Sequence, residues 1–170
     1  MRDQETKTLL PLRASMALAV AGLALGDLLV KSAVVLTMGQ GQLWDLGVVN
    51  VRLAYNTGVA FGLGATLSPW IVLAATAAIV AVLAVYLYRA APGFNRVSRA
   101  GAILLLGGAV GNLVDRTDGA GVVDYLHTGW FPTFNLADVF VTVGVGLLVV
   151  GSIRTPALAP KKKRGADRWT

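Results

Sequence analysis

Long hydrophobic runs alternate with short polar stretches along the chain. Four runs stand out, at about residues 14–37, 69–88, 97–113 and 135–153. A helix that crosses a lipid bilayer needs roughly 20 predominantly apolar residues, which is close to the length of each run. Ser68 and Pro69 predict an N-cap and a first helical residue for the second run. The pattern predicts an α-helical polytopic membrane protein with four transmembrane helices.

The stretches between the hydrophobic runs predict two segments on the outer side of the bilayer. Residues 38–67 include LGVVNVRLAYN, which alternates loosely and is rich in β-branched residues, as a strand or hairpin is. Residues 117–134 contain three glycines and a proline, which are typical of a loop. We expect a small extracytoplasmic β element between the first two helices and an extracytoplasmic loop between the last two.

The composition agrees with a membrane protein and excludes several kinds of site. Of the 170 residues, 55% are hydrophobic and 14% are charged, whereas typical soluble domains carry about 25% charged residues. The chain has no cysteine and one histidine. Disulfides, thiolate sites, cysteine nucleophiles and histidine-rich metal sites are therefore excluded.

Basic residues are distributed unevenly and predict the orientation. The net charge is +6, and the basic residues gather in residues 1–13, between the second and third runs, and in residues 154–170. Cytoplasmic loops of membrane proteins carry an excess of Lys and Arg, so we expect both termini in the cytoplasm. The chain then divides into a cytoplasmic N-terminal segment (1–13), one membrane domain (14–153) and a basic cytoplasmic tail (154–170). Beside a membrane span, the expected partner of this tail is anionic lipid and not nucleic acid.

Polar residues within and between the hydrophobic runs gather at one depth, near the outer boundary of the predicted membrane. Four of the nine acidic residues lie within residues 111–138. The residues at this depth are Asp27, Lys31, Asn112, Asp115, Asp124, Asn135 and Asp138. Charged groups in a membrane are costly and commonly functional, so their convergence predicts a site.

Two pairs of these residues also have a structural interpretation. Asn135 and Asp138 stand three apart at a helix start, as an N-cap and an acidic third residue do. Asp27 and Lys31 stand four apart on one helix face. For this second pair the favoured interpretation is mutual neutralisation, which lets both charges enter the bilayer.

Asp118 and Asp124 represent two different kinds of acidic residue. Asp118 lies in RTDGAG, a turn-forming sequence, whereas Asp124 lies in GVVDYL, with apolar neighbours and no capping position.

Two carboxylates held close together cannot both ionise readily, so one keeps its proton. The ionised group can deprotonate water while the protonated one protonates a leaving amine. This aspartic chemistry hydrolyses peptides without a metal ion.

Five sequence blocks, in order, resemble the bacterial lipoprotein signal peptidases, the type II signal peptidases. The blocks are DLLVK at 27–31, NTGVAF at 56–61, GGAVGNLVDR at 107–116, VVDY at 122–125 and FNLAD at 134–138. The resemblance implies an intramembrane aspartic endopeptidase of the bacterial inner membrane, active near its outer face. Such an enzyme removes the signal peptide of a prolipoprotein by cutting before the lipobox cysteine, once that cysteine carries a diacylglyceryl group.

The resemblance also implies roles for individual residues. The catalytic pair falls on Asp124 and Asp138. Supporting or substrate-binding roles fall on Asn56, Gly58, Asn112, Asp115, Arg116 and Asn135, and a structural role falls on Asp27 and Lys31. No metal or cofactor is implied, and the expected partners are diacylglyceryl-modified prolipoproteins and membrane phospholipid. The expected state is a monomer that the cyclic peptide globomycin inhibits.

Three features depart from the usual family pattern. Leu28 and Val30 stand where the family usually has Gln and a Ser or Thr, which removes hydrogen-bonding side chains from the first block. Tyr125 stands where Phe is commoner. Thirteen residues separate Asp124 from Asp138, fewer than usual, so we expect a short loop over the site.

Two other functions compete with this interpretation. A metal-dependent transferase of phospholipid head groups would bind Mg²⁺ through the aspartates and would lose activity with a chelator. A small transporter would line a pathway with Asp27 and Lys31 and would need polar residues along whole spans. The inner halves of the four runs contain no such polar track.

Overall fold

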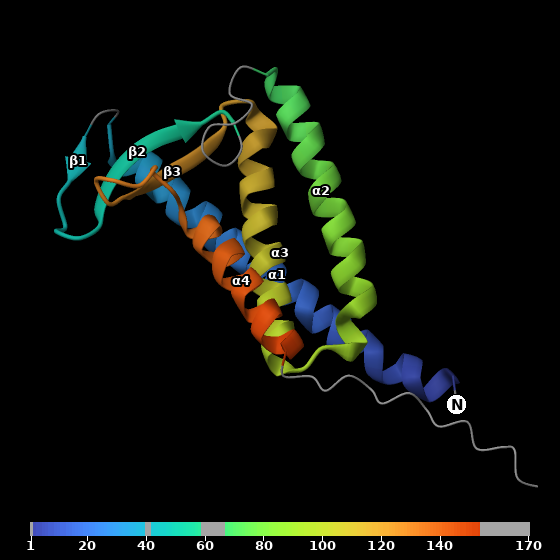
Figure 1. The fold of residues 1–170 in the computed structure, drawn as a ribbon. Helices are drawn as coiled ribbons and strands as arrows, with labels where there is room; N and C mark the ends of the chain where they lie inside the picture. The colour runs from blue at the N-terminus through green and yellow to red at the C-terminus, as the bar shows by residue number, and fades with distance from the viewer. Residues whose placement is uncertain (1, 40–41, 59–66, 154–170) are drawn as a thin grey trace, which may run out of the picture.

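Four helices and a small sheet make up the described part of the chain. The computed structural model describes residues 2–39, 42–58 and 67–153, and for residues 2–10 only the backbone. The elements in chain order are α1 (Arg2–Thr37), β1 (Leu43–Trp44), β2 (Asn50–Asn56), α2 (Pro69–Ala90), α3 (Arg96–Asp115), β3 (Val122–His127) and α4 (Leu136–Ile153), with short 3₁₀ turns after α2 and α3. The helices lie side by side, and the sheet projects from one end of the bundle (Figure 1). The predicted tail, residues 154–170, lies outside the described residues.

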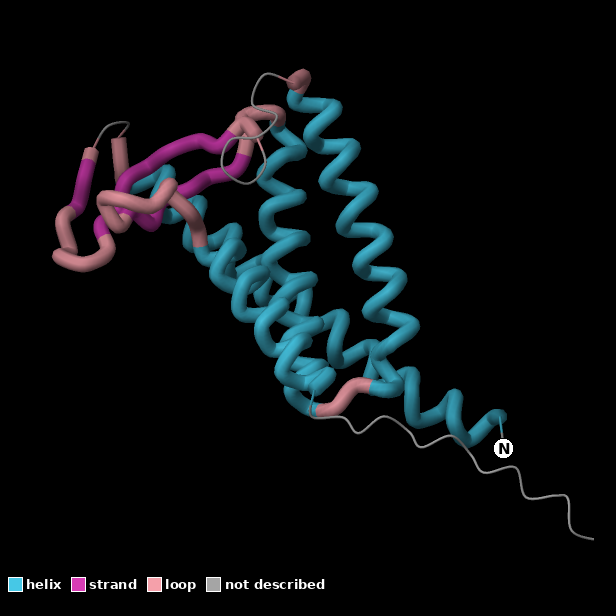
Figure 2. Tube along the Cα trace, in the orientation of Figure 1, coloured by secondary structure: helices cyan, strands magenta, loops and turns pink. Residues whose placement is uncertain are grey.

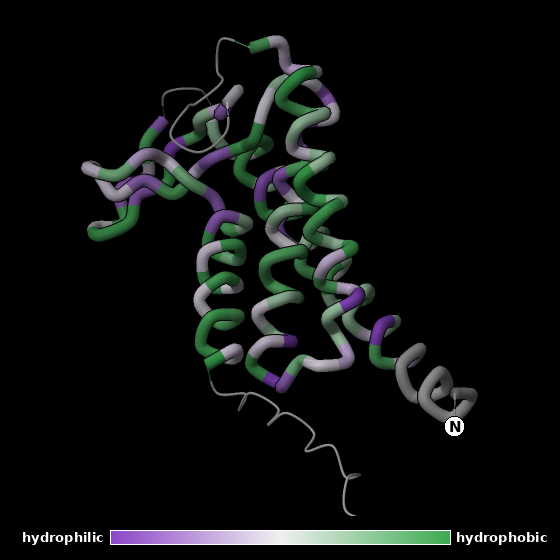
Figure 3. Tube along the Cα trace, turned by 45° about the vertical axis from the view of Figure 1, so that its right-hand side comes forward, coloured by the Kyte–Doolittle hydropathy of each residue, from purple (hydrophilic) through white to green (hydrophobic). Residues whose placement is uncertain are grey.

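The four predicted membrane helices are confirmed. Each contains a stretch long and apolar enough to cross a membrane, namely Pro11–Thr37, Pro69–Gly93, Arg96–Asp118 and Leu136–Ile153. Hydrophobic residues cover the middle of the helices, while hydrophilic ones lie in the sheet, where it joins the bundle, and at the opposite end of the bundle (Figure 3). The first helix begins earlier than expected, at Arg2, and continues through Pro11. Ser68 is the N-cap residue of α2, as predicted, but its hydroxyl makes no capping hydrogen bond.

Helix α3 is the centre of the bundle and packs closely against α4. Small residues allow this approach, because a Cβ at Gly101 would lie 2.7 Å from the carbonyl oxygen of Gly144. One turn nearer the start of α3, a Cβ at Gly151 of α4 would lie 2.7 Å from the backbone nitrogen of Ser98. Lipid offers helices no hydrophobic drive to associate, so close van der Waals packing at small residues holds such interfaces together.

Helix α2 packs less extensively than the other three helices. Its buried residues, Val72, Val80 and Leu87, form one narrow stripe. Leu87 joins the hydrophobic core at the end of the bundle away from the sheet, where it lies with Met16 of α1 and Leu105 of α3. The remaining surface of α2 is apolar and exposed, as suits a helix that faces lipid.

The sheet is antiparallel, with the strand order β1–β2–β3 (Figure 2). The predicted β element between the first two helices is present as β1 and β2. The third strand comes from residues 117–134, which were expected to form a loop. Val122–His127 becomes a strand because it pairs with β2, which places Asp124 opposite Ala54 and Val122 opposite Asn56. This long-range pairing leaves little mark on the local sequence.

Candidate active site

The predicted site residues meet where the sheet joins the bundle. Asp124 lies on β3, and its side chain is buried. Asp138 lies in the first turn of α4, and Asn112 lies near the C-terminal end of α3. Strand β3 and the start of α4 are brought together by a short antiparallel bridge between Leu126 and Phe134.

Asn135 is completely buried and connects the two candidate catalytic carboxylates. Its Nδ2 donates to Oδ1 of Asp124 at 2.7 Å and to Oδ1 of Asn112 at 3.2 Å. Its Oδ1 accepts a hydrogen bond of 2.9 Å from the backbone N–H of Asp138. One carboxamide therefore fixes the Asp124 side chain and the backbone of Asp138 together.

Asp138 accepts hydrogen bonds on both of its carboxylate oxygens. Oδ2 accepts from the backbone N–H of Asn135 at 3.2 Å, which completes a reciprocal cap at the start of α4. Oδ1 accepts from Nδ2 of Asn112 at 2.9 Å. The predicted N-cap pair is thus present, and its members also belong to the cluster around Asp124.

The surroundings of Asp124 disfavour its ionised form. Burial raises the pKa of this carboxyl most, and the nearby charge of Asp138 raises it further. Hydrogen bonds from Asn135 and Asn56 and the charge of Lys31 act in the opposite direction, and the resulting pKa is about 6. An ordinary Asp has a pKa of 3.8, so Asp124 keeps its proton to a higher pH than an ordinary aspartate does.

Lys31 occupies the centre of a second cluster beside the two aspartates. Its Nζ lies 2.7 Å from Oδ2 of Asp27 and 2.8 Å from Oδ2 of Asp115. It also donates a hydrogen bond of 2.8 Å to Oδ1 of Asn112. The predicted contact between Asp27 and Lys31 is present, and it extends from α1 to α3.

The two carboxylates paired with Lys31 also accept backbone hydrogen bonds. Oδ1 of Asp27 accepts from the N–H of Ala137 in the first turn of α4, at 2.9 Å. Oδ2 of Asp115 accepts from the N–H of Val123 on β3, at 3.1 Å. These two backbone contacts were not predicted, because nothing in the local sequence marks a backbone N–H as the partner of a distant carboxylate.

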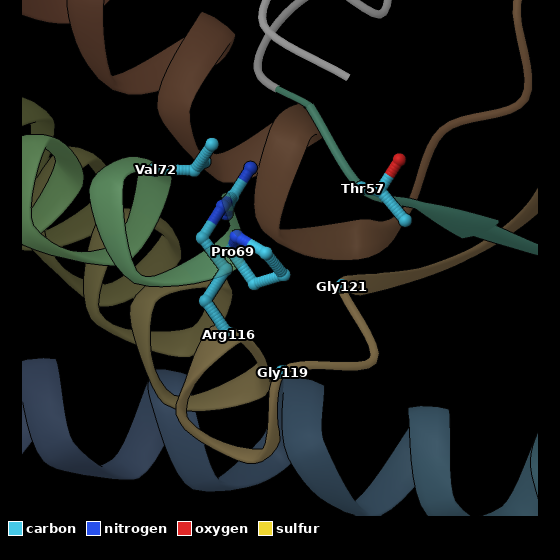
Figure 4. Close-up of a pocket in the computed structure, with 6 residues that line it drawn as sticks. All are labelled: Thr57, Pro69, Val72, Arg116, Gly119 and Gly121. Atoms are coloured by element: carbon cyan, nitrogen blue, oxygen red, sulfur yellow. The ribbon is translucent and has the colours of Figure 1, made fainter. Parts of the chain in front are cut away.

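Arg116 joins the end of α3 to the segment that follows β2. Its Nη1 donates to the carbonyl oxygen of Asn112 at 2.8 Å, and its Nη2 donates to that of Gly58 at 2.9 Å. Asn56 accepts a hydrogen bond of 3.0 Å from the N–H of Gly58. A small pocket lies here, where the Arg116 side chain passes beside Pro69 toward Val72 of α2 and Thr57 lies on the other side of Pro69 (Figure 4).

Asp118 and Tyr125 lie near the site without joining its hydrogen-bond cluster. Oδ1 of Asp118 accepts from the N–H of Ala120 at 2.8 Å, which agrees with the predicted turn. Tyr125, the residue after Asp124, is buried, and burial raises the pKa of its phenol to about 12. The phenol therefore stays neutral. The remainder of the NTGVAF block, from Val59 to Phe61, lies outside the described residues.

The described residues contain no group of three or more His, Asp or Glu side chains placed to hold a metal ion. Asp27 and Asp115 approach each other, but the ammonium of Lys31 lies between them. Asp124 and Asp138 are instead bound by the carboxamides of Asn135 and Asn112.

Comparison with known proteins identifies relatives of the same size. The family described as Signal peptidase (SPase) II matches residues 18–154. The lipoprotein signal peptidases of Burkholderia thailandensis and Burkholderia cenocepacia are each 40% identical over 134 residues, which cover 75% of this chain and 81% of the relative.

Two solved structures of bacterial membrane enzymes share the fold. One, determined in meso at 2.3 Å, has a TM-score of 0.70 at 25% identity and covers 90% of this chain and 94% of its own. The other, at 1.9 Å, has a TM-score of 0.66 at 26% identity, with 85% and 95% covered. Together with the four apolar helices, these neighbours show a multi-pass membrane protein. Because the family match spans most of the chain and the relatives cover it at 40% identity, the chain belongs to the signal peptidase II family.

Proposed function

We propose that this protein removes signal peptides from prolipoproteins by aspartic hydrolysis, with Asp124 and Asp138 as the catalytic pair. One observation carries the proposal: a single buried carboxamide, that of Asn135, binds the Asp124 carboxylate and the backbone of Asp138. The two carboxylates are also close enough for the charge of Asp138 to raise the pKa of Asp124. General acid catalysis requires a carboxyl that keeps its proton, and the raised pKa of Asp124 suits it to that role.

The hydrogen bonds assign different tasks to the two carboxylates. Asp138, with a donor on each oxygen, is stabilised as the ionised base and takes a proton from water. The water oxygen bonds to the scissile carbonyl carbon as Asp124 gives its proton to the carbonyl oxygen. The gem-diol then collapses and the C–N bond breaks as Asp138 passes the proton taken from water to the leaving amine. A hydroxyl of the gem-diol returns a proton to Asp124 as the new carboxyl group of the signal peptide forms.

The supporting residues organise the space around this pair. Asn56 donates to Asp124 and orders Gly58, whose carbonyl oxygen is held by Arg116. This segment borders the pair and is placed to bind the substrate backbone. Asn112 and Asn135 keep the two carboxylates in position.

The position of the site suits a lipid-modified substrate. The pair lies where the sheet meets apolar helices, so diacylglyceryl chains can remain in lipid while the adjacent peptide bond reaches the carboxylates. The bond proposed to be cut is the one just before the modified cysteine. The last turn of α2, which contains Arg89, and the start of α3 at Arg96 form the end of the bundle away from the sheet (Figure 1). Basic residues favour the cytoplasmic side, so the site faces the outer surface of the inner membrane.

A reconstituted cleavage assay tests the function. Purified protein in lipid is given a diacylglyceryl-modified prolipoprotein, and product is followed for wild type, Asp124→Asn and Asp138→Asn. We expect both variants to lose about 10²- to 10⁴-fold in kcat, as removal of an acid or base group does. Asp118→Asn is the matched control, because its asparagine can still accept from Ala120, and it should retain full activity. Near-normal cleavage by either catalytic variant would exclude the aspartic mechanism.

The same assay separates the peptidase from the metal-dependent head-group transferase. EDTA should leave cleavage unchanged, whereas an enzyme that used Mg²⁺ would stop. Globomycin should inhibit. Family membership already argues against the transferase, and loss of activity with EDTA that Mg²⁺ restores would revive it.

A further inference from the structure

We propose that Lys31 is a positioning residue for the catalytic pair, because its ammonium fixes which end of the Asn112 carboxamide faces Asp138. The inference rests on the proposed function, since it assigns a role toward Asp124 and Asp138. It goes beyond the neutralising role expected for Lys31 with Asp27.

The contacts of Lys31 exceed what charge neutralisation requires. The ammonium has three N–H donors and no acceptor, and it is almost completely buried, at 2% exposure. Two of its neighbours are the carboxylates of Asp27 and Asp115. The third is a neutral group, the Oδ1 atom of Asn112, at 2.8 Å. Since the two carboxylates already outweigh the charge of the ammonium, the third contact serves another purpose.

That purpose follows from the two chemically different ends of a carboxamide. An amide end that faces an ammonium must be the oxygen, because an NH₂ group would place donors against donors. With Oδ1 held by Lys31, the Nδ2 of Asn112 is directed toward Asp138, to which it donates at 2.9 Å. Asp138 is then faced by a group that can only donate, which favours the ionised carboxylate that a general base must be.

The orientation of the Asn112 carboxamide also affects the hydrogen bond to Asp124. Oδ1 of Asn112 also accepts from Nδ2 of Asn135 at 3.2 Å, and this nitrogen donates to Asp124 at 2.7 Å. A rotated Asn112 would place its NH₂ group against that of Asn135. With Oδ1 of Asn112 accepting from both Lys31 and Asn135, each aspartate accepts a hydrogen bond from the NH₂ group of an asparagine.

The absence of cysteine from the sequence allows a direct test. Lys31→Cys introduces the only thiol, which 2-bromoethylamine converts into an aminoethyl side chain that ends in an ammonium. Alkylation with 1-bromopropane gives a side chain of similar length without donors. Both modifications are made on the unfolded protein, which is then refolded into lipid, in the wild-type background and with Asn112→Leu.

If Lys31 positions the catalytic pair through Asn112, its ammonium should raise kcat only when Asn112 is present. The aminoethyl form should exceed the propyl form by roughly 10- to 100-fold in kcat with Asn112 in place, as expected for a hydrogen bond to a charged group. With Asn112→Leu the ratio should fall below about twofold, although the ammonium should raise the thermal unfolding temperature in both backgrounds. Equal gains in kcat in both backgrounds would show a structural role and overturn the proposal.

A second variant covers the case in which the propyl form does not fold. Asn112→Asp keeps an acceptor for Lys31 but turns an oxygen toward Asp138, which is otherwise faced by Asp124 and by the charge of Arg116. We expect a lower kcat at unchanged KM, because Asp138 loses the donor on Oδ1 and meets a second carboxylate in its place. An unchanged kcat would overturn the proposal.

The assay distinguishes an incorrect catalytic pair from an incorrect role for Lys31. If Asp138→Asn cleaves normally in the same assay, the catalytic pair is wrong whatever the alkylated proteins do. If Asp138→Asn is inactive and the ammonium acts equally with and without Asn112, the pair stands and the positioning role of Lys31 falls.

Discussion

The carboxylate of Asp27 accepts a hydrogen bond of 2.9 Å from the backbone N–H of Ala137, 110 residues further along the chain. The first N–H groups of a helix lack partners within it and carry the positive end of its dipole. A side chain of α1 therefore caps α4 one residue before Asp138. The same carboxylate pairs with Lys31, so one residue connects the catalytic turn to the charge cluster.

Replacing Asp27 by asparagine should separate these two contacts. Asp27→Asn retains an oxygen for the N–H of Ala137 but loses its charge, while Lys31 keeps Asp115 as a partner. We expect the free energy of unfolding to fall by about 1–3 kcal/mol, the usual cost of weakening a buried hydrogen bond to a charged group. Thermal and denaturant unfolding in detergent micelles measure it. Ser32→Ala on the exposed face of α1 is the control, and an equal effect there would contradict a specific role.

Gly111 leaves the space in which Asp27 sits. A Cβ at this position would lie 2.7 Å from Oδ2 of Asp27, closer than real side-chain contacts allow. Gly111→Ala should displace the carboxylate and lower stability by about 1–3 kcal/mol, in the range of overpacked cores. The matched control is Gly22→Ala, because nothing lies within 4 Å of its added methyl group. Alanine should be neutral or slightly stabilising there, and similar losses at both positions would exclude a local clash.

The helices were predictable because each one is a long apolar run that only a membrane explains. The β3 strand was not, because GVVDYLH lies among glycines and becomes a strand only through pairing with β2, more than 60 residues earlier. Asp124 therefore lies on a paired strand and not in the expected loop. The start of α1 was also missed, since the polar residues before Pro11 do not resemble a membrane span.

The cluster of site residues was predictable in its depth but not in its contacts. Helix lengths place Asp27, Asn112 and Asp138 at one level of the bundle, which the structure confirms. Which atoms meet depends on how α1, α3 and α4 rotate against one another, and that is set by packing at residues such as Gly108 and Gly111. For the same reason, the structural and catalytic interpretations of Asn135 were not true alternatives. The residue caps α4 and binds Asp124 at once.

The pH dependence of cleavage should reflect Asp124. The proposed acid must be protonated, and burial together with the charge of Asp138 raises the pKa of Asp124 to about 6. We expect kcat/KM, which reports the free enzyme, to fall as the pH rises through about 6. Profiles of initial rate at low substrate concentration measure it. Asp118→Asn should show the same limb, whereas a rate that stayed constant to pH 8 would contradict the assignment of Asp124 as the acid.

The same pKa shift predicts that Asp124 destabilises the folded protein at neutral pH. The pKa is about 6 when folded and near the ordinary 3.8 when unfolded, so the folded state binds the proton more tightly. Stability is then highest below about pH 4 and is lost as the pH rises through about 6, by roughly 3 kcal/mol for a shift of about two units. Asp124→Asn removes this dependence.

Unfolding of wild type and Asp124→Asn at a series of pH values measures the difference. The asparagine can still accept from Nδ2 of Asn135, so we expect the variant to be the more stable protein at pH 7 and the gap to close near pH 4. Subtracting the two curves removes the contributions of the other carboxylates. A gap that widened toward low pH would have the wrong sign and would exclude a raised pKa.

Arg116 should act mainly on substrate binding. Its planar guanidinium donates to Asn112 and to Gly58 through different nitrogens, at 2.8 Å and 2.9 Å. Lysine carries its charge on one atom and cannot span both carbonyl oxygens. Because Gly58 belongs to the segment proposed to hold the substrate backbone, Arg116→Lys should raise KM by about tenfold and change kcat less. Steady-state kinetics with Arg52→Lys, on the exposed face of β2, as control measure the split. A loss confined to kcat would instead place Arg116 with the catalytic pair, and an unchanged KM would show that the order of this segment does not depend on the guanidinium.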